Sequence, residues 1–186
     1  MENELSRGIQ EFGRELKILL QNRNYLHVKA APADAPGLIL WARSRMGMDV
    51  LQLISVVDRI EDGEFQITWI LERSRGGDVL LISSSYPRKN CRVPTMTSLW
   101  PAAAAFEREL FEMFGISFPG NPREGEDFLL EGWNEIPPMR RDFDTLKYSM
   151  ENFGERRARE HTDVRELISR RTGEWETPVP MKEEDR

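Results

Sequence analysis

The first part of the chain alternates between helical and strand patterns of apolar positions. In residues 4–22 apolar side chains recur at steps of four and three, which is typical of one face of a helix, and Asn3 can cap its start. Two short apolar runs, 25–30 and 38–42, follow on either side of a loop that contains Pro32 and Pro36. We expect these two runs to form paired strands.

Three further segments, 49–58, 65–72 and 79–86, are rich in Val, Ile, Leu and aromatic residues. Gly63 ends the turn between the first two segments, and Gly76 and Gly77 lie between the second and the third. Strands joined by such short turns pair with their neighbours in the chain. A helix followed by an antiparallel meander predicts the α+β class, as a two-layer domain with an antiparallel or mixed sheet packed against helices.

A second helical pattern begins after the meander. Thr97 or Ser98 can cap it, Pro101 fits its first turn, and Gly115 can end it in the left-handed conformation. One apolar stripe follows this helix: Leu99, Ala103, Phe106, Leu110 and Met113. We therefore expect an α+β core domain over residues 1–115.

The remaining residues differ in composition from the core domain. Residues 116–143 contain too many prolines and glycines for regular structure, so something else must hold them, and we expect this segment to bind a partner. Residues 144–186 are charged and carry few large apolar side chains, which predicts an extended tail. Trp175, Pro178 and Pro180 could anchor that tail on a neighbouring subunit.

Charge and composition exclude several classes of protein. The net charge of −6 argues against a protein that neutralises nucleic-acid phosphates, and no apolar run is long enough to insert into a membrane. With one cysteine, Cys91, and two distant histidines, His27 and His161, we expect no metal, no cofactor and no catalytic residues in this chain. The acidic start is unlike a secretory signal, so we expect an intracellular protein.

The most suggestive ionisable cluster lies on the second helix. Glu107 and Glu109 are about 200° apart on a helix, so they flank the apolar stripe and cannot form a catalytic pair. Acids beside aromatic side chains, away from the chain's own core, indicate a surface made to be covered. We expect five residues here to contact a partner: Trp100, Glu107, Arg108, Glu109 and Phe111. The alternative is a solvated face on which Arg108 pairs with Glu112.

A second candidate site follows Pro137 and Pro138. Arg140 and Arg141 in a stiffened loop can bind partner carboxylates or carbonyls bidentately, and Asp142 lies next to them. The alternative is a pair of solvated arginines. A stand-alone enzyme or a small-ligand-binding domain that uses the acidic helix for its own ligand also remains open.

Taken together, residues 97–103, 106–116, 118–122 and 137–143 resemble the thirty-kilodalton subunit family of respiratory complex I. The most specific part is Glu107-Arg108-Glu109, followed by Glu112-Met113-Phe114-Gly115-Ile116. The resemblance implies a structural subunit without cofactors, docked on the hydrogenase-like large subunit and near the iron–sulfur small subunit. It would lie peripherally on the cytoplasmic side of the membrane and contact the membrane arm only indirectly. Iron–sulfur clusters and a nickel–iron centre would belong to the partner subunits.

The chain also departs from the family pattern. Gly120-Asn121-Pro122 stands where the family usually has Gly-His-Pro, and the acidic residues 124–127 replace a basic residue and an apolar pair. These departures favour the related branch of membrane-bound, energy-converting hydrogenases and sulfur reductases. The alternative is the thirty-kilodalton subunit of NADH:quinone oxidoreductase itself.

Overall fold

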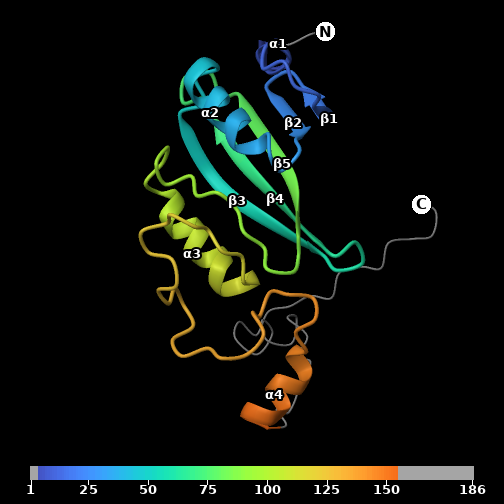
Figure 1. Cartoon of the computed structure of the whole chain (residues 1–186), viewed down its shortest axis with the longest axis vertical. Helices are drawn as coiled ribbons and strands as arrows, with labels where there is room; N and C mark the ends of the chain where they lie inside the picture. The colour runs from blue at the N-terminus through green and yellow to red at the C-terminus, as the bar shows by residue number, and fades with distance from the viewer. Residues whose placement is uncertain (1–3, 155–186) are drawn as a thin grey trace, which may run out of the picture. The chain divides into compact units, whose positions relative to one another are not determined.

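The computed structural model describes residues 4–154 and divides the chain into two compact units, the first ending at Asp144 and the second beginning at Thr145. A five-stranded sheet forms the centre of the first unit (Figure 1). In chain order its elements are α1 (Glu4–Gln10), β1 (Lys17–Asn22), β2 (Tyr25–Lys29), α2 (Ala35–Arg45), β3 (Val50–Arg59), β4 (Glu64–Glu72), β5 (Val79–Pro87) and α3 (Ala103–Phe114).

The strands are arranged in the order β1-β2-β5-β4-β3. Strands β3, β4 and β5 form the predicted antiparallel meander, and β1 and β2 form an antiparallel hairpin. The two parts join through β2 and β5, which pair in parallel. The sheet is therefore mixed, and the predicted α+β class is confirmed.

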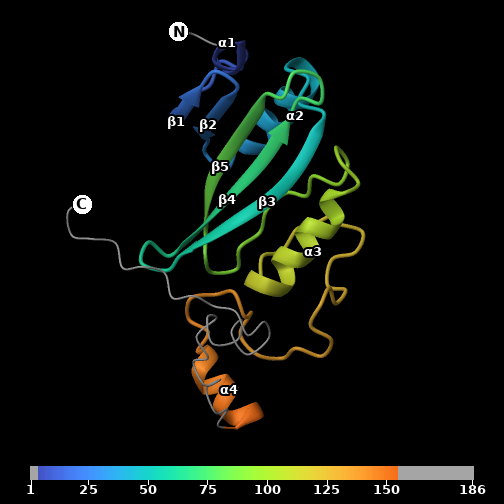
Figure 2. The same ribbon diagram turned by 180° about the vertical axis from the view of Figure 1, so that it is seen from behind.

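One face of the sheet carries the core. Phe65, Ile67, Trp69 and Leu71 alternate along β4 and are fully buried on this face. Helix α2 crosses in front of the sheet in Figure 1 and behind it in Figure 2, so it covers a single face. The ring of Phe114, at the end of α3, makes an edge contact with the ring of Phe65, which places α3 against the same face.

Two predicted elements near the N-terminus were wrong. The helix expected over residues 4–22 ends at Gln10, because Gly13 adopts φ 71° and residues 17–22 then pair with β2. The strand expected over residues 38–42 is part of α2. Ala35, Leu38, Ile39 and Ala42 are spaced as on one helical face and are all buried there, so the run that suggested a strand is the inner side of a helix.

Helix α3 begins later than predicted. Residues 97–102 form turns, and the helix starts at Ala103 without a side-chain cap from Thr97 or Ser98. Its end is as predicted: Gly115 adopts φ 75°, and its N–H donates to the carbonyl of Phe111 at 2.8 Å.

The second unit is described as far as residue 154 and contains α4 (Thr145–Phe153). The start of the segment predicted to be extended is therefore helical, and within α4 the rings of Tyr148 and Phe153 are in contact. The predicted anchor residues Trp175, Pro178 and Pro180 lie outside the described residues. Within residues 4–154, no helix has both the length and the apolar character that crossing a membrane requires.

Gly115 gives a direct test of how α3 joins the segment that follows it. A Cβ at this position would lie 3.3 Å from Cγ of Pro137, and its positive φ already disfavours any other residue. Gly115→Ala should lower the free energy of unfolding by more than the roughly 1–2 kcal/mol of left-handed strain alone. Gly47→Ala is the matched control, because Gly47 has φ 71° and no neighbour within 4 Å. If Gly115→Ala and Gly47→Ala lose equal free energy of unfolding in urea, the contact with Pro137 does not contribute to stability.

Candidate partner interface

The candidate site consists of α3 and residues 116–143, which pass around its C-terminal half (Figure 1). As predicted, these residues form neither helix nor strand, apart from a single bridge between Ser117 and Arg92. Their backbone polar groups therefore lack the partners that a sheet ladder would provide. Side chains of α3 and of the sheet provide several of them.

Glu107 is buried inside this arrangement, with 1% of its surface exposed. Its Oε1 accepts the Met96 N–H at 2.7 Å, and its Oε2 accepts the Thr95 hydroxyl at 2.7 Å and Nδ2–H of Asn121 at 2.9 Å. Burial raises the pKa of the Glu107 carboxyl, and the three donated hydrogen bonds only partly oppose that shift. Glu107 thus joins the loop before α3 to the segment after it.

This position corrects two sequence-based expectations. Glu107 and Trp100 were expected to face a partner, but both lie in the interior of this chain. Trp100 is 7% exposed, its Nε1–H donates to the carbonyl of Asp49 at 2.8 Å, and the guanidinium of Arg43 lies 5.0 Å from its ring. Residues 95–96 and Asn121 lie beside the apolar stripe of α3, so Glu107 is covered although it flanks the stripe.

Arg108 was expected to contact a partner or, alternatively, to pair with Glu112 at the surface. It is buried in this chain, and both side chains bind residues 126–130 instead. Nη2 of Arg108 donates to the carbonyl of Asp127 at 3.1 Å, and its guanidinium lies 5.2 Å from the ring of Phe128. The Glu112 carboxylate accepts three consecutive N–H groups at 2.8–3.1 Å, those of residues 128–130. Burial tends to raise the pKa of Glu112, but these N–H groups prevail and lower it.

A network of charges centred on Arg88 fixes the other end of the segment. Arg88 binds Asp58 through Nε at 2.8 Å and Asp142 through Nη2 at 2.6 Å. The Arg141 N–H also donates to Asp58 at 2.9 Å, and Arg141 Nη1 binds Glu61 at 2.6 Å. The hydrogen bonds from Arg88 hold the pKa of Asp142 well below its usual range. Residues 140–142 are thereby tied to the ends of β3 and β5.

The three predicted residues of that loop thus have partners within the chain. Arg140 donates through Nε and Nη2 to Asp142, both at 3.2 Å, so the predicted bidentate geometry is present but internal. Arg141 is half exposed and keeps its ion pair with Glu61 at the surface. Whether these groups also touch another chain stays a prediction.

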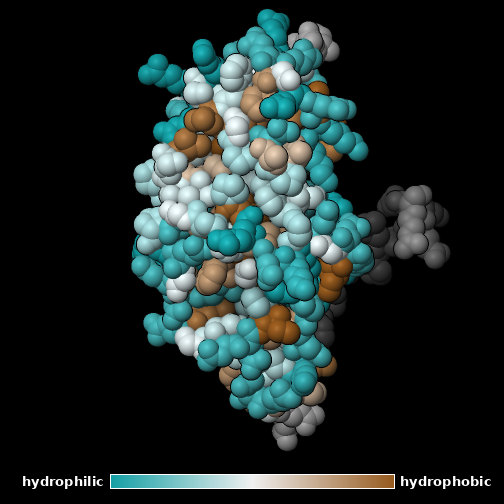
Figure 3. All heavy atoms as spheres, in the orientation of Figure 1, coloured by the Kyte–Doolittle hydropathy of each residue, from teal (hydrophilic) through white to brown (hydrophobic). Residues whose placement is uncertain are grey.

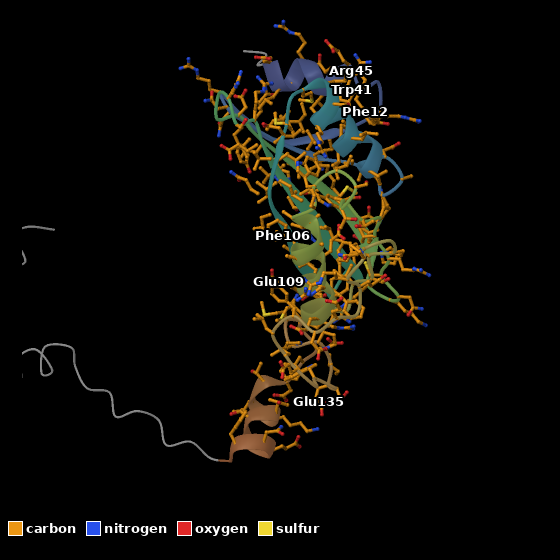
Figure 4. The ribbon with its side chains drawn as sticks, turned by 90° about the vertical axis from the view of Figure 1, so that its left-hand side faces the viewer. Phe12, Trp41, Arg45, Phe106, Glu109 and Glu135 are labelled. Atoms are coloured by element: carbon orange, nitrogen blue, oxygen red, sulfur yellow. The ribbon has the colours of Figure 1, made fainter. Side chains whose placement is uncertain are left out.

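Two of the predicted residues do face outward. Glu109 is half-buried, and within residues 4–154 its carboxylate forms no hydrogen bond or ion pair. Figure 4 shows Glu109 and Phe106 on the same side of α3. Phe111 is 36% exposed, and three large apolar side chains of residues 116–143 are also exposed: Leu129, Ile136 and Met139. Brown patches near the C-terminal end of α3 in Figure 3 mark hydrophobic surface in this region.

Four residues of the site were not predicted from the sequence: Asp58, Arg88, Glu112 and Asn121. A signal for the first two was present, because inward positions alternate along β3 and β5, and continuing that alternation turns Asp58 and Arg88 toward the core side. A charged residue at an inward position indicates an internal partner. Glu112 and Asn121 were noted in the sequence, but the partners that they have in the structure were not. Glu112 binds the irregular backbone of residues 128–130, and Asn121 binds Glu107 and the Ala104 carbonyl, contacts that no periodicity indicates.

Within residues 4–154, no three His, Cys, Asp or Glu side chains come together in a way that could hold a metal ion. The arrangement that is present can position a loop and display its side chains.

Comparison with known proteins identifies a family. The family described as "Respiratory-chain NADH dehydrogenase, 30 Kd subunit" matches residues 28–149, which include the meander, α3 and the whole of the segment 116–143.

Individual relatives agree with this match. A NADH-quinone oxidoreductase subunit of Moorella thermoacetica is 33% identical over 92 residues, which are 49% of this chain and 62% of that protein. A larger subunit of the NADH-quinone oxidoreductase of Pseudomonas fluorescens is 39% identical over 74 residues, 40% of this chain and 12% of that protein. The matched region therefore spans less than two thirds of either relative.

A solved structure shares the fold. A chain of the archaeal membrane-bound sulfane sulfur reductase, a respiratory membrane complex, superposes with a TM-score of 0.76 and 21% identity. The alignment covers 85% of this chain and 95% of that one. This likeness confirms the arrangement of the sheet and helices.

Removing the Glu107 carboxylate should destabilise the isolated chain. Glu107→Ala leaves two buried donors, the Met96 N–H and the Asn121 amide, and the half-buried Thr95 hydroxyl without their acceptor, and each buried donor costs about 1–3 kcal/mol. Glu107→Gln keeps one acceptor oxygen and should lose less. Thermal unfolding of the free chain measures this, and an unchanged melting temperature in Glu107→Ala would contradict an internal role for the residue.

The Arg88 network should make the free energy of unfolding depend on pH in the acid range. Asp58 and Asp142 both have pKa values below the ordinary 3.8: Asp58 although burial opposes it, Asp142 chiefly because of Arg88. Their contribution to the free energy of unfolding is present when the pH is above the ordinary aspartate pKa, and it is lost as the pH falls through the lowered pKa values. Asp142→Asn should therefore show a smaller loss of stability than wild type between neutral pH and about pH 3.

Asp62→Asn, which removes an exposed ion pair with Arg59, is the control for losing a surface carboxylate. Urea unfolding at the two pH values measures the effect. If Asp142→Asn and wild type lose stability equally on acidification, the network does not fix the segment.

Proposed function

The chain belongs to the respiratory-chain NADH dehydrogenase 30-kDa subunit family, and from this membership we propose that it is a non-catalytic structural subunit of an ion-translocating membrane oxidoreductase related to complex I. In this role it docks on the hydrogenase-like large subunit and lies near the iron–sulfur small subunit. It holds no cofactor itself. Iron–sulfur clusters, and in one branch a nickel–iron centre, belong to those partners, and the chain lies peripherally on the cytoplasmic side of the membrane.

The observation that carries this proposal is the way in which residues 116–143 are held. An irregular segment exposes three large apolar side chains, Leu129 at 69%, Ile136 at 46% and Met139 at 59%. Such a segment would ordinarily turn these side chains inward or remain mobile, but Arg108, Glu112 and the Arg88 network fix its backbone. Apolar groups displayed on a fixed backbone are typical of a surface that another protein covers.

Glu109 and Phe111 belong to the same proposed surface. Phe111 is partly exposed and lies near Leu130 and Trp133 of the segment, and the carboxylate of Glu109 has no partner within the described residues. A charge on the partner could therefore pair with Glu109 without first breaking an internal bond. Pairing of this kind contributes to specificity and to orientation at an interface.

The branch of the family is a further part of the proposal. The departures at Asn121 and at residues 124–127 favour the membrane-bound hydrogenase or sulfur-reductase branch. The structure gives the first departure a role, because Asn121 donates to both Glu107 and the Ala104 carbonyl. The alternative is NADH:quinone oxidoreductase, which is the name that the relatives from Moorella thermoacetica and Pseudomonas fluorescens carry.

Purification of the tagged chain from its native host tests the proposal. We expect a hydrogenase-like large subunit and an iron–sulfur small subunit to co-purify in equal amounts, and the remaining subunits to identify the branch. Recovery of the chain alone, under conditions that keep membrane complexes intact, would contradict the proposed role and favour a stand-alone binding domain.

Variants of the outward residues give a sharper test. Glu109→Ala should reduce the recovered partners without lowering the melting temperature of the free chain. Phe111→Ala should reduce them too, with a small drop in melting temperature, because most of the Phe111 side chain packs within the chain. A partner charge left buried and unpaired costs about 3–5 kcal/mol, which is enough to dissociate a complex during washing. Glu15→Ala changes an exposed acid far from α3 and should have no effect on recovery. Loss of melting temperature in parallel with loss of recovery in Glu109→Ala would make Glu109 an internal residue.

A further inference from the structure

A narrow cleft of about 210 Å³ opens between the C-terminal turn of α3 and residues 125–137. Its lining includes four apolar residues: Phe111, Leu130, Trp133 and Pro137. The indole of Trp133 is fixed, because its Nε1–H donates to the carbonyl of Ile136 at 3.1 Å and its ring makes an edge contact with Phe143. The cleft therefore has a rigid aromatic wall.

The lining also includes four acidic residues and no basic residue. Glu112 is occupied by the N–H groups of residues 128–130, and Glu126 pairs with Arg123 at 2.7 Å. The carboxylates of Asp127 and Glu135 form no hydrogen bond or ion pair with the residues that the structure describes. Figure 4 labels Glu135 beyond the end of α3. Two acidic residues of the lining, Asp127 and Glu135, thus have no counter-charge among the described residues.

The geometry limits what can enter. The volume is below the roughly 300–1,000 Å³ of small-molecule sites and suits a single side chain. Anions are excluded by the carboxylates, and the acids do not converge as metal ligands would. A flat cation fits best, because a guanidinium can stack on an aromatic ring and at the same time donate hydrogen bonds to carboxylates.

We propose that the cleft receives an arginine side chain of the partner subunit, an inference that rests on the proposed function. The exposed side chains of Leu129 and Ile136 belong to the same segment as the cleft, and Phe111 is both a cleft residue and a member of the exposed surface. The partner segment is accordingly an arginine flanked by apolar residues. A buried aromatic and an arginine are the residue types that contribute most binding free energy at protein interfaces.

The test uses the assembled complex and two variants of the cleft. Glu135→Lys and Asp127→Lys place a cation where the arginine should enter, and each should raise the rate of partner dissociation at least about tenfold. Glu131→Lys is the matched control, because Glu131 is an exposed acid of the same segment that does not line the cleft. It should change the rate less than about twofold.

The melting temperature of each free variant separates misfolding from loss of the contact. Trp133→Ala gives a third, uncharged change in the wall and should also speed dissociation. Wild-type capture of the partners, with dissociation unchanged in both charge-reversal variants, would overturn the cleft proposal and leave the proposed function standing. Failure of the wild-type chain to capture any partner would instead overturn the proposed function.

The identity of the entering side chain is tested with phenylglyoxal, which modifies accessible guanidinium groups. An arginine of the partner should be protected in the wild-type complex and modified in the Glu135→Lys complex, as read by mass spectrometry. Two results would overturn the assignment: no protected arginine on the partner, or protection only of arginines in residues 155–186 of this chain, which would make the chain's own C-terminal part the occupant.

Discussion

The structure depends on how the backbone of residues 116–143 is satisfied. A segment without helix or ladder has to find other partners for its N–H and carbonyl groups, because leaving them buried and unpaired costs free energy. Arg108 and Glu112 of α3 provide such partners at one end, where Glu107 also binds the side chain of Asn121. Asp58, which Arg88 holds, accepts the Arg141 N–H at the other end. The polar residues of the helix are thus used inside the chain, although their pattern in the sequence is that of a surface.

A segment that is already ordered lowers the conformational-entropy cost of binding a partner. Ordering a residue costs about 1–2 kcal/mol, so a mobile segment would have to be ordered when a partner binds. Here much of that cost is met during folding of the chain itself, and Leu129, Ile136 and Met139 remain exposed on an ordered backbone. Membership of the 30-kDa subunit family agrees with a chain whose role is to present such a surface. The departure from the family pattern at Asn121 acts through the same element, because its amide binds the buried Glu107.

Much of the fold could be predicted from the sequence, and the failures have physical causes. The meander and the end of α3 at Gly115 followed from alternation and turn chemistry, which are local properties. The strand expected at residues 38–42 was wrong because a short apolar run fits a buried helix face equally well. At the site, the sequence identified α3 and the arginines of residues 140–141 but assigned Glu107 and Trp100 to a partner. The burial of Glu107 depends on where residues 95–96 and 121 lie, and that of Trp100 on where Arg43 and Asp49 lie. No periodicity in the sequence encodes these contacts between distant segments.

The central claim is that α3 and the Arg88 network order residues 116–143 before any partner binds. Hydrogen exchange of the isolated chain tests this most directly, because the N–H groups of Met96, of residues 128–130 and of Arg141 are those bound by Glu107, Glu112 and Asp58. The account predicts that these amides exchange far more slowly than in an unstructured peptide, and that Glu112→Gln selectively speeds exchange at residues 128–130. Exchange of the wild-type amides at unstructured rates in the isolated chain would contradict it.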